Sequence, residues 1–141
     1  MKIQLKRLNS DYHFETINER GHIVHLDNKG EGVAQGASPM ELLLMGIAGC
    51  SGIDIVMILK KQKIELLDLQ MEVEGFRQDG AVPNVFTAIK LIVKLKGDFA
   101  PEKAKRAVDL SIDKYCSVAK MLEKTAEISY DVYLNGDLVE L

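Results

Sequence analysis

A long apolar segment over residues 39–61 constrains the fold of this chain more than any other feature. Ser38 stands directly before the segment, a proline opens it, and Glu41 follows the serine by three residues. This is a capping box, which satisfies the first backbone donors of a helix. Such a helix is roughly 34 Å long, about the width of a small domain. Because Ser51 is the only strongly polar side chain between positions 42 and 53, this part of the helix must be surrounded by protein or by lipid.

A membrane is the weaker of these two surroundings. Glu41 and Asp54 limit the apolar run to less than the roughly 18 residues that a membrane span needs. The N-terminal residues alternate between polar and apolar and do not form a secretory signal. Lys and Arg number 18 against 21 Asp and Glu, so there is no basic excess to attract nucleic acid or an anionic membrane. We therefore predict a cytoplasmic protein whose partners include neither nucleic acid nor a membrane.

The length and composition of the chain fit one globular domain. A chain of 141 residues lies within the usual range of a single domain. Hydrophobic residues make up 47% and charged residues 28%, which excludes a disordered or low-complexity chain. Since no linker or internal repeat interrupts the sequence, we predict a single domain over residues 1–141.

Segments in which polar and apolar residues alternate predict strands on both sides of the long helix. The predicted strands are residues 2–8, 11–17, 22–26, 67–76, 85–95 and 128–134. Residues 27–37 carry three glycines and predict a loop that leads into the long helix. Pro101 begins a second predicted helix, and Cys116 begins a shorter third one that ends near Lys124. This order predicts an α+β fold in which the long central helix is buried against an antiparallel sheet.

Two cysteines, Cys50 and Cys116, are the residues most suited to chemistry in this sequence. They are too few for a disulfide scaffold, and there is neither a CxxC motif nor a Cys/His cluster at zinc spacing. In a cytoplasmic protein both thiols are reduced by default. We predict that the protein holds no metal and no cofactor.

The face of the long helix around Cys50 carries Gly46, Ile53 and Asp54, which lie three or four residues from it. Three glycines spaced by three, at positions 46, 49 and 52, form a bare stripe beside the cysteine. They fit either the close approach of another helix or a space around the sulfur for a second thiol and a substrate. Asp54 would raise the pKa of the Cys50 thiol unless the carboxylate is paired.

Cys116 lies where the second predicted helix gives way to the third. The backbone N–H groups of a first helical turn carry partial positive charge, so we expect them to lower the pKa of this thiol. A single buried cysteine is more often a small apolar side chain than a reactive one. Here, however, two cysteines both occupy places that need a special backbone arrangement. On this ground a redox pair and two structural cysteines are about equally favoured.

Two segments, SPMELLLMGIAGCSGIDIV and VDLSIDKYCSVAKMLEKTAEISY, resemble the cysteine motifs of the OsmC/Ohr superfamily, and most closely its YhfA-type branch. The resemblance covers nearly the whole chain, from the first predicted hairpin to the last strand. It implies an OsmC-like α+β fold and an interwoven homodimer with the long helices at its centre. It also implies a thiol-dependent reductase of organic hydroperoxides or hydrogen peroxide in oxidative-stress defence. Cys50 would be the peroxidatic cysteine and Cys116 the resolving one, with an external dithiol as reductant.

The sequence departs from this family in the groups that activate the reactive thiolate, which are an arginine from the N-terminal strands and a glutamate ten residues before the cysteine. Here Met40 stands ten residues before Cys50 and Glu41 nine. Nine residues turn a helix by about 180°, so Glu41 would point away from the thiol unless the helix bends. The nearest arginines are Arg7 and Arg20. The possible supporting residues are Glu41, Asp54, Arg7 and Arg20.

This departure favours a second function, that of a redox-sensing or small-molecule-binding protein that keeps the fold and the thiols but does not turn over peroxide. A long helix wrapped by a sheet also fits hot-dog thioesterases, but the sequence shows no carboxylate or histidine arrangement for a thioester pocket. His22 and His25 are three residues apart on a predicted strand and face opposite sides. With His13, they are predicted to be surface residues rather than metal ligands.

Overall fold

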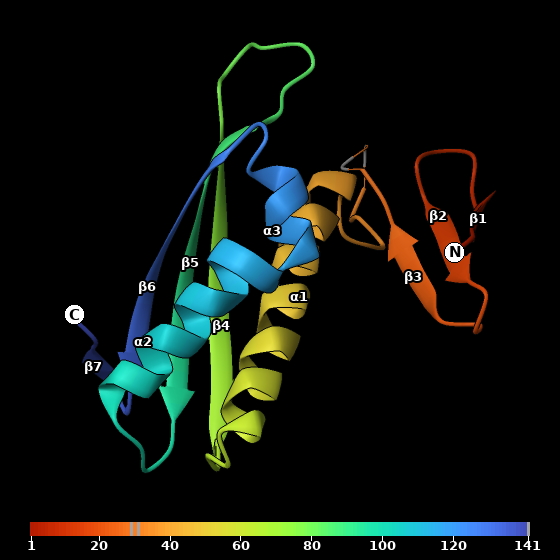
Figure 1. The fold of residues 1–141 in the computed structure, drawn as a ribbon. Helices are drawn as coiled ribbons and strands as arrows, with labels where there is room; N and C mark the ends of the chain where they lie inside the picture. The colour runs from red at the N-terminus through yellow and green to blue at the C-terminus, as the bar shows by residue number, and fades with distance from the viewer. Residues whose placement is uncertain (29, 31, 141) are drawn as a thin grey trace. The chain divides into compact units, whose positions relative to one another are not determined.

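The structure is a computed structural model that describes residues 1–28, 30 and 32–140 (Figure 1). It contains two compact units, Met1–Leu43 and Leu44–Leu141. Two residues of the predicted loop 27–37, at positions 29 and 31, and the last residue of the chain lie outside the described part.

The first unit is built on a three-stranded antiparallel sheet with the strand order β1-β2-β3. Its strands are β1 (Ile3–Arg7), β2 (Phe14–Asn18) and β3 (Ile23–Leu26), which confirms the three strands predicted for this part of the sequence. All residues of β1 are exposed, including Ile3 and Leu5. The buried apolar side chains of the described residues all belong to the second unit, so this small sheet lacks the core that independent stability requires.

The long helix, α1 (Pro39–Lys61), begins and ends where its sequence signals predict. The Glu41 backbone N–H donates to Ser38 Oγ, and the Ser38 backbone N–H donates to Glu41 Oε1, both at 3.2 Å. These two bonds are the predicted capping box. By length and composition α1 could also cross a membrane, but the core helix of a folded protein passes the same test. Ile47, Ile55 and Leu59 are fully buried in the second unit, as expected for a core helix.

A four-stranded sheet with the order β4-β5-β6-β7 forms the base of the second unit. Its strands are β4 (Asp68–Arg77), β5 (Phe86–Lys96), β6 (Glu127–Leu134) and β7 (Asp137–Leu138). β4 and β5 are antiparallel as predicted, whereas β5 and β6 are parallel, so the prediction of a wholly antiparallel sheet is wrong for this pair. The helical connection between them returns the chain to the starting end of β5 before β6 begins, as a parallel pair requires.

That connection consists of α2 (Pro101–Leu110), the π-helix η1 (Ser111–Tyr115) and α3 (Ser117–Leu122). The second predicted helix therefore reaches Tyr115, but its hydrogen bonding changes at Ser111. The Cys116 backbone N–H donates to Ser111 O at 2.7 Å, five residues back, which is the π-helical pattern. Figure 1 shows α1 and α2 side by side on one face of the four-stranded sheet.

The core of the second unit lies between that face of the sheet and the helices. Strand β5 alternates between its two faces, with four buried apolar residues on one face and exposed lysines on the other. The four buried residues on that face are Ile89, Leu91, Val93 and Leu95, and Phe86 at the start of β5 is buried as well. Their counterparts on the helices are Ile47, Ile55, Leu59, Ala104, Ala107 and Val108.

One side of α1 is not buried within a single chain. Met45, Ile53, Val56 and Met57 on this side are exposed, with Ile53 at 63% of its full accessibility. A contiguous exposed apolar surface marks a place where another molecule packs. This side of the helix is therefore apolar and exposed in the part of the chain that the structure describes.

The charge of Glu41 should contribute to stability in a pH-dependent way. Hydrogen bonding by the Ser38 hydroxyl and backbone N–H lowers the pKa of the Glu41 carboxyl. A carboxylate whose pKa is lowered by folding stabilises the folded state above its ordinary pKa, and this contribution is lost as the pH falls through the lowered value. The difference in urea midpoint between the protein and its Glu41→Gln variant should therefore shrink as the pH falls through that range. A difference that stays constant with pH would contradict this role.

Candidate functional site

The structure brings the two cysteines of the second unit together from distant parts of the sequence. Cys50 lies in the middle of α1, and Cys116 is the N-cap residue of α3. The sulfur atoms of both cysteines and a carboxylate oxygen of Asp54 all lie within 4.8 Å of one another. Both thiols are free, Cys116 is buried and Cys50 is half-buried. This trio is the candidate functional site.

Local backbone geometry explains how each member of the trio reaches the site. Cys50 and Asp54 are one helical turn apart, so their side chains leave α1 on the same face. Cys116 follows directly after η1, where the wider turn ends in an extended residue. The buried Ser111 Oγ donates to Ser51 O at 3.1 Å, which ties the start of η1 to α1 next to Cys50.

Burial, rather than the helix terminus, dominates the acidity of Cys116. Its Sγ accepts a hydrogen bond from the Ala119 backbone N–H at 3.3 Å, as its predicted place at the start of α3 implied. Burial nevertheless raises the pKa of the Cys116 thiol to about 11, with a smaller contribution from the neighbouring Cys50 thiol, and outweighs the Ala119 N–H. The prediction that this pKa is lowered is therefore wrong. At neutral pH Cys116 is a thiol.

Asp54 is the predicted supporting residue that lies directly beside the thiols. Its Oδ2 atom is buried and has no hydrogen-bond partner within the described part of the chain. Burying a carboxylate oxygen without a donor costs free energy, since the oxygen loses its hydration and gains nothing in return. The Asp54 Oδ2 atom thus lacks a donor among the described residues.

The glycine stripe of α1 does not provide a close approach of backbones within this chain. A Cβ atom at Gly46 would lie 3.7 Å from Val118 Cγ1, and one at Gly52 would lie 4.0 Å from Leu69 Cδ2, which are ordinary contacts. At Gly49 no described atom lies within 4 Å of such a Cβ. Within the stripe, open space among the described residues is therefore limited to Gly49, next to Cys50, and both interpretations of the stripe stay predictions.

Next to Asp54 the second unit has a groove of 390 Å³. Its walls come from the C-terminal half of α1, including Met57 and Ile58, and from Leu110 and Tyr115 at the end of α2 and in η1. The sequence alone does not reveal this groove, because its walls come from segments more than forty residues apart. The arrangement suits a small molecule with an apolar part and a polar end near the trio.

The other predicted supporting residues belong to the first unit. The Arg7 guanidinium donates to the backbone oxygens of Asp11 and Ser10, at 3.0 and 2.5 Å, in the turn after β1. Arg20 lies in the turn between β2 and β3. Glu41 takes part in the capping box of α1. Each of these three residues thus has a local structural place in its own unit.

The histidines also lie in the first unit. His13 Nε2 and His25 Nδ1 are hydrogen-bonded at 2.9 Å, whereas His22 pairs with the Asn18 side chain at 3.2 Å. His22 and His25 therefore have different partners, and His22 lies directly before β3 whereas His25 lies within it. The His13–His25 pair was missed in the sequence, because it depends on the alignment of β3 with the turn before β2.

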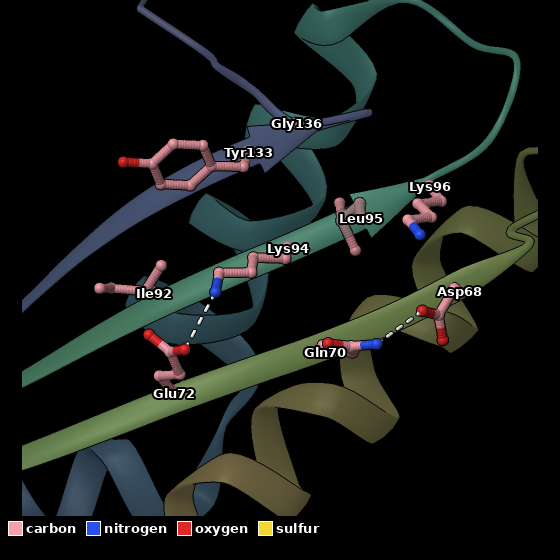
Figure 2. Close-up of a pocket in the computed structure, with 9 residues that line it drawn as sticks. All are labelled: Asp68, Gln70, Glu72, Ile92, Lys94, Leu95, Lys96, Tyr133 and Gly136. Carbon is pink, nitrogen blue, oxygen red and sulfur yellow. Dashed lines mark hydrogen bonds and ion pairs between the residues drawn. The ribbon is translucent and has the colours of Figure 1, made fainter.

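A second hollow, of 440 Å³, lies on the face of the sheet that points away from the helices (Figure 2). Within it, Lys94 forms an ion pair with Glu72 at 3.0 Å, and the Gln70 amide donates to Asp68 at 3.1 Å. Neighbouring groups on β4 and β5 thus satisfy one another, and neither cysteine lines this hollow. The chemistry of the second unit is concentrated on its helical side.

Comparison with known proteins gives consistent matches over both cysteines. Residues 30–131 match the family described as OsmC-like protein. The protein YhfA of Escherichia coli (strain K12) is 43% identical over 116 residues, which are 79% of this chain and 84% of YhfA. These matches confirm the resemblance inferred from the two cysteine segments.

Solved structures share the fold over nearly the whole chain. An OsmC-like protein from Mycoplasma pneumoniae has a TM-score of 0.82 at 22% identity, covering 94% of this chain and 95% of that one. The organic hydroperoxide resistance protein OhrB of Bacillus subtilis has a TM-score of 0.66 at 18% identity, covering 96% and 98%. The predicted α+β fold is therefore confirmed, with the parallel β5–β6 pair as its one correction.

The hydrogen bond from Ser111 Oγ to Ser51 O should contribute measurably to the stability of the protein. Ser111→Ala removes a buried hydrogen bond and should lower the free energy of unfolding by about 1 kcal/mol. Ser117→Ala, at an exposed position six residues later, is the matched control and should change it by less than about 0.5 kcal/mol. Urea unfolding of both variants tests this, and equal effects would refute a special role of Ser111.

Proposed function

Because the chain belongs to the OsmC-like family, we propose that it is a thiol-dependent peroxide reductase that uses Cys50 and Cys116. The observation that carries this proposal is the close approach of two free thiols, whose sulfurs lie within 4.8 Å of each other across 66 positions of sequence. Two thiols at this distance can form a disulfide after small adjustments of their side chains. The proposed role is defence against peroxides.

The proposed reaction proceeds in three balanced steps. The Cys50 thiolate attacks one oxygen of the hydroperoxide, the O–O bond breaks, and Cys50 becomes a sulfenic acid. The remaining alkoxide takes up a proton and leaves as an alcohol. The Cys116 thiol then condenses with the sulfenic acid, so that a disulfide forms and water leaves. An external dithiol reduces this disulfide through thiol–disulfide exchange and becomes a disulfide itself.

The acidity of Cys116 supports this division of roles. The attacking group must be a thiolate, and a thiol whose pKa is raised to about 11 stays protonated at neutral pH. Cys116 is also fully buried, whereas Cys50 is partly accessible to an incoming oxidant. Both properties favour Cys50 as the peroxidatic cysteine and Cys116 as the resolving one.

The groove beside Asp54 supports an organic hydroperoxide over hydrogen peroxide as substrate. Met57, Ile58 and Leu110 give it apolar walls that can cover the hydrocarbon part of such a molecule. Hydrogen peroxide has no apolar part and gains nothing from them. Bacillus subtilis OhrB, which shares the fold, is an organic hydroperoxide resistance protein by name.

A second candidate function is that of a redox-sensing or small-molecule-binding protein without peroxide turnover. The specific observation in its favour is the local engagement of two predicted supporting residues. Arg7 donates to backbone oxygens of its own turn, and Glu41 is held in the capping box of α1. Both residues thus have local partners that are unrelated to Cys50.

We further infer that two copies of the chain form an interwoven homodimer. The exposed apolar side of α1 and the small sheet of the first unit both lack cover within one chain, and Ile3, Leu5 and Ile53 are each more than 60% exposed. A second copy offers the same apolar surfaces, so a symmetric pair can bury them against each other. In this assembly residues 1–141 would act as one OsmC-like domain. Reduced thiols and the proposed activity agree with a cytoplasmic location.

Peroxide consumption tests the proposed reaction directly. The protein with a dithiol such as dihydrolipoamide should consume cumene hydroperoxide over many turnovers, and Cys50→Ser should abolish the reaction because the attacking sulfur is gone. Cys116→Ser should still react once and then accumulate sulfenic or sulfinic acid at Cys50, which mass spectrometry detects. Ser117→Ala, next to the resolving cysteine, is the matched control and should keep full activity.

Other outcomes separate the two candidate functions. A Cys50–Cys116 disulfide that forms slowly, without multiple turnovers, would exclude the reductase and favour the redox sensor. Oxidised protein in which the two cysteines are never linked would exclude both the reductase and the redox sensor, and would leave only a small-molecule-binding protein. Unchanged consumption by Cys50→Ser would show that the reaction does not use this thiol.

The homodimer predicts a solution mass twice that of the 15.7 kDa chain. Ile53→Glu places a charge in the proposed interface and should shift the mass towards one chain in analytical ultracentrifugation. Val82→Glu, at an exposed position between β4 and β5, should leave the mass unchanged. Wild-type protein with the mass of a single chain at micromolar concentration would contradict the assembly.

A further inference from the structure

Asp54 has a carboxylate oxygen within 4.8 Å of both sulfurs, and its buried Oδ2 has no hydrogen-bond partner among the residues that the structure covers. Nearby thiols are weak donors and compensate poorly for the lost hydration of a carboxylate. A cation bound between the three groups would supply what the carboxylate lacks. The buried oxygen therefore points to a ligand that carries positive charge.

The spacing of the three donor atoms suits a single small metal ion. A tetrahedral zinc ion holds thiolate sulfur at about 2.3 Å and carboxylate oxygen at about 2.0–2.2 Å, which places the ligand atoms about 3.5–3.8 Å apart. The three atoms already lie within 4.8 Å of one another. Side-chain movements of about 1 Å would bring them to that geometry.

We propose that the reduced protein binds one Zn²⁺ per chain through Cys50, Cys116 and Asp54. Thiolate sulfur prefers zinc to magnesium or calcium, which prefer oxygen ligands. Three protein ligands leave the fourth tetrahedral position to water. On binding, the two thiols release their protons to the solvent and no electrons are transferred.

Zinc and a disulfide exclude each other at these sulfurs. A sulfur atom in a disulfide is not a thiolate, so oxidation of the pair removes two of the three ligands. Conversely, zinc holds both thiolates and blocks the attack on a peroxide. This regulatory consequence rests on the proposed function, whereas the zinc site itself does not.

A competition titration tests the site on the reduced full-length protein. Metal-free protein under anaerobic conditions, titrated with Zn²⁺ against a chromophoric chelator, should bind one equivalent per chain. Cys50→Ser and Cys116→Ser should each remove this binding. Asp54→Asn keeps the shape of the side chain but removes its charge, and should weaken binding by at least about tenfold. Asp131→Asn, at an exposed carboxylate, should bind zinc as the wild type does.

The hydrogen-bonded His13–His25 pair is the competing place for zinc. A variant with both His13→Ala and His25→Ala should keep the full affinity. With Co²⁺ as a probe, the wild type and this variant should show a near-ultraviolet thiolate-to-cobalt band that both cysteine variants lack. Absence of zinc binding, binding that follows the histidines, or an affinity unchanged by Asp54→Asn would overturn the proposal.

Peroxide turnover of the same samples separates this proposal from the proposed function. Zinc binding without turnover by the zinc-free protein would remove the reductase and leave the zinc site standing. Turnover without zinc binding would remove the zinc site and leave the reductase standing. If both hold, one equivalent of Zn²⁺ should stop the turnover, and a chelator should restore it.

Discussion

The burial of α1 is the constraint on which the rest of this structure depends. The helix is apolar on all sides over much of its length, and one face packs on the sheet through Ile47, Ile55 and Leu59. That face fixes the positions of β5 and α2, whose apolar residues complete the same core. The opposite face is exposed among the residues that the structure describes, and half-buried Cys50 lies on the same helix. The Cys50 thiol is thus held on a long helix yet stays partly accessible.

Local signals in the sequence predict the helices and strands of this fold well. They predict less well how segments that are distant in the sequence pair with one another. The capping box at Ser38 and the alternation in β5 are read within a few residues, and both match the structure. The parallel pairing of β5 and β6 depends on where a connection of about thirty residues delivers the chain, which no local pattern encodes. The π-helix before Cys116 likewise reflects packing against α1 through Ser111, not a local preference.

The same distinction holds for the candidate site. The spacing of Cys50 and Asp54 on one helix predicts that they are neighbours, and they are. The position of Cys116 at a helix start was also predicted correctly, but the predicted lowering of its pKa is wrong, because burial outweighs one backbone donor. Burial depends on the whole core and is invisible in a cysteine's sequence neighbours. For the same reason the proposed zinc site, whose residues come from two distant segments, does not appear in a search of the sequence for ligand spacing.

The π-helix also limits how this segment can diverge among related chains. Asp113, Lys114 and Tyr115 are exposed, although Asp113 accepts a hydrogen bond from the Tyr130 hydroxyl and Tyr115 lines the groove beside Asp54. The number of residues between Ser111 and Cys116 is a different matter, because the bond between them closes a turn that is one residue wider than an α-helical turn. Loss of one residue would restore a regular turn and rotate the sulfur by about 100° around the helix axis. An insertion or deletion in this stretch would therefore move Cys116 away from Cys50 even if Ser111 and Cys116 were both kept.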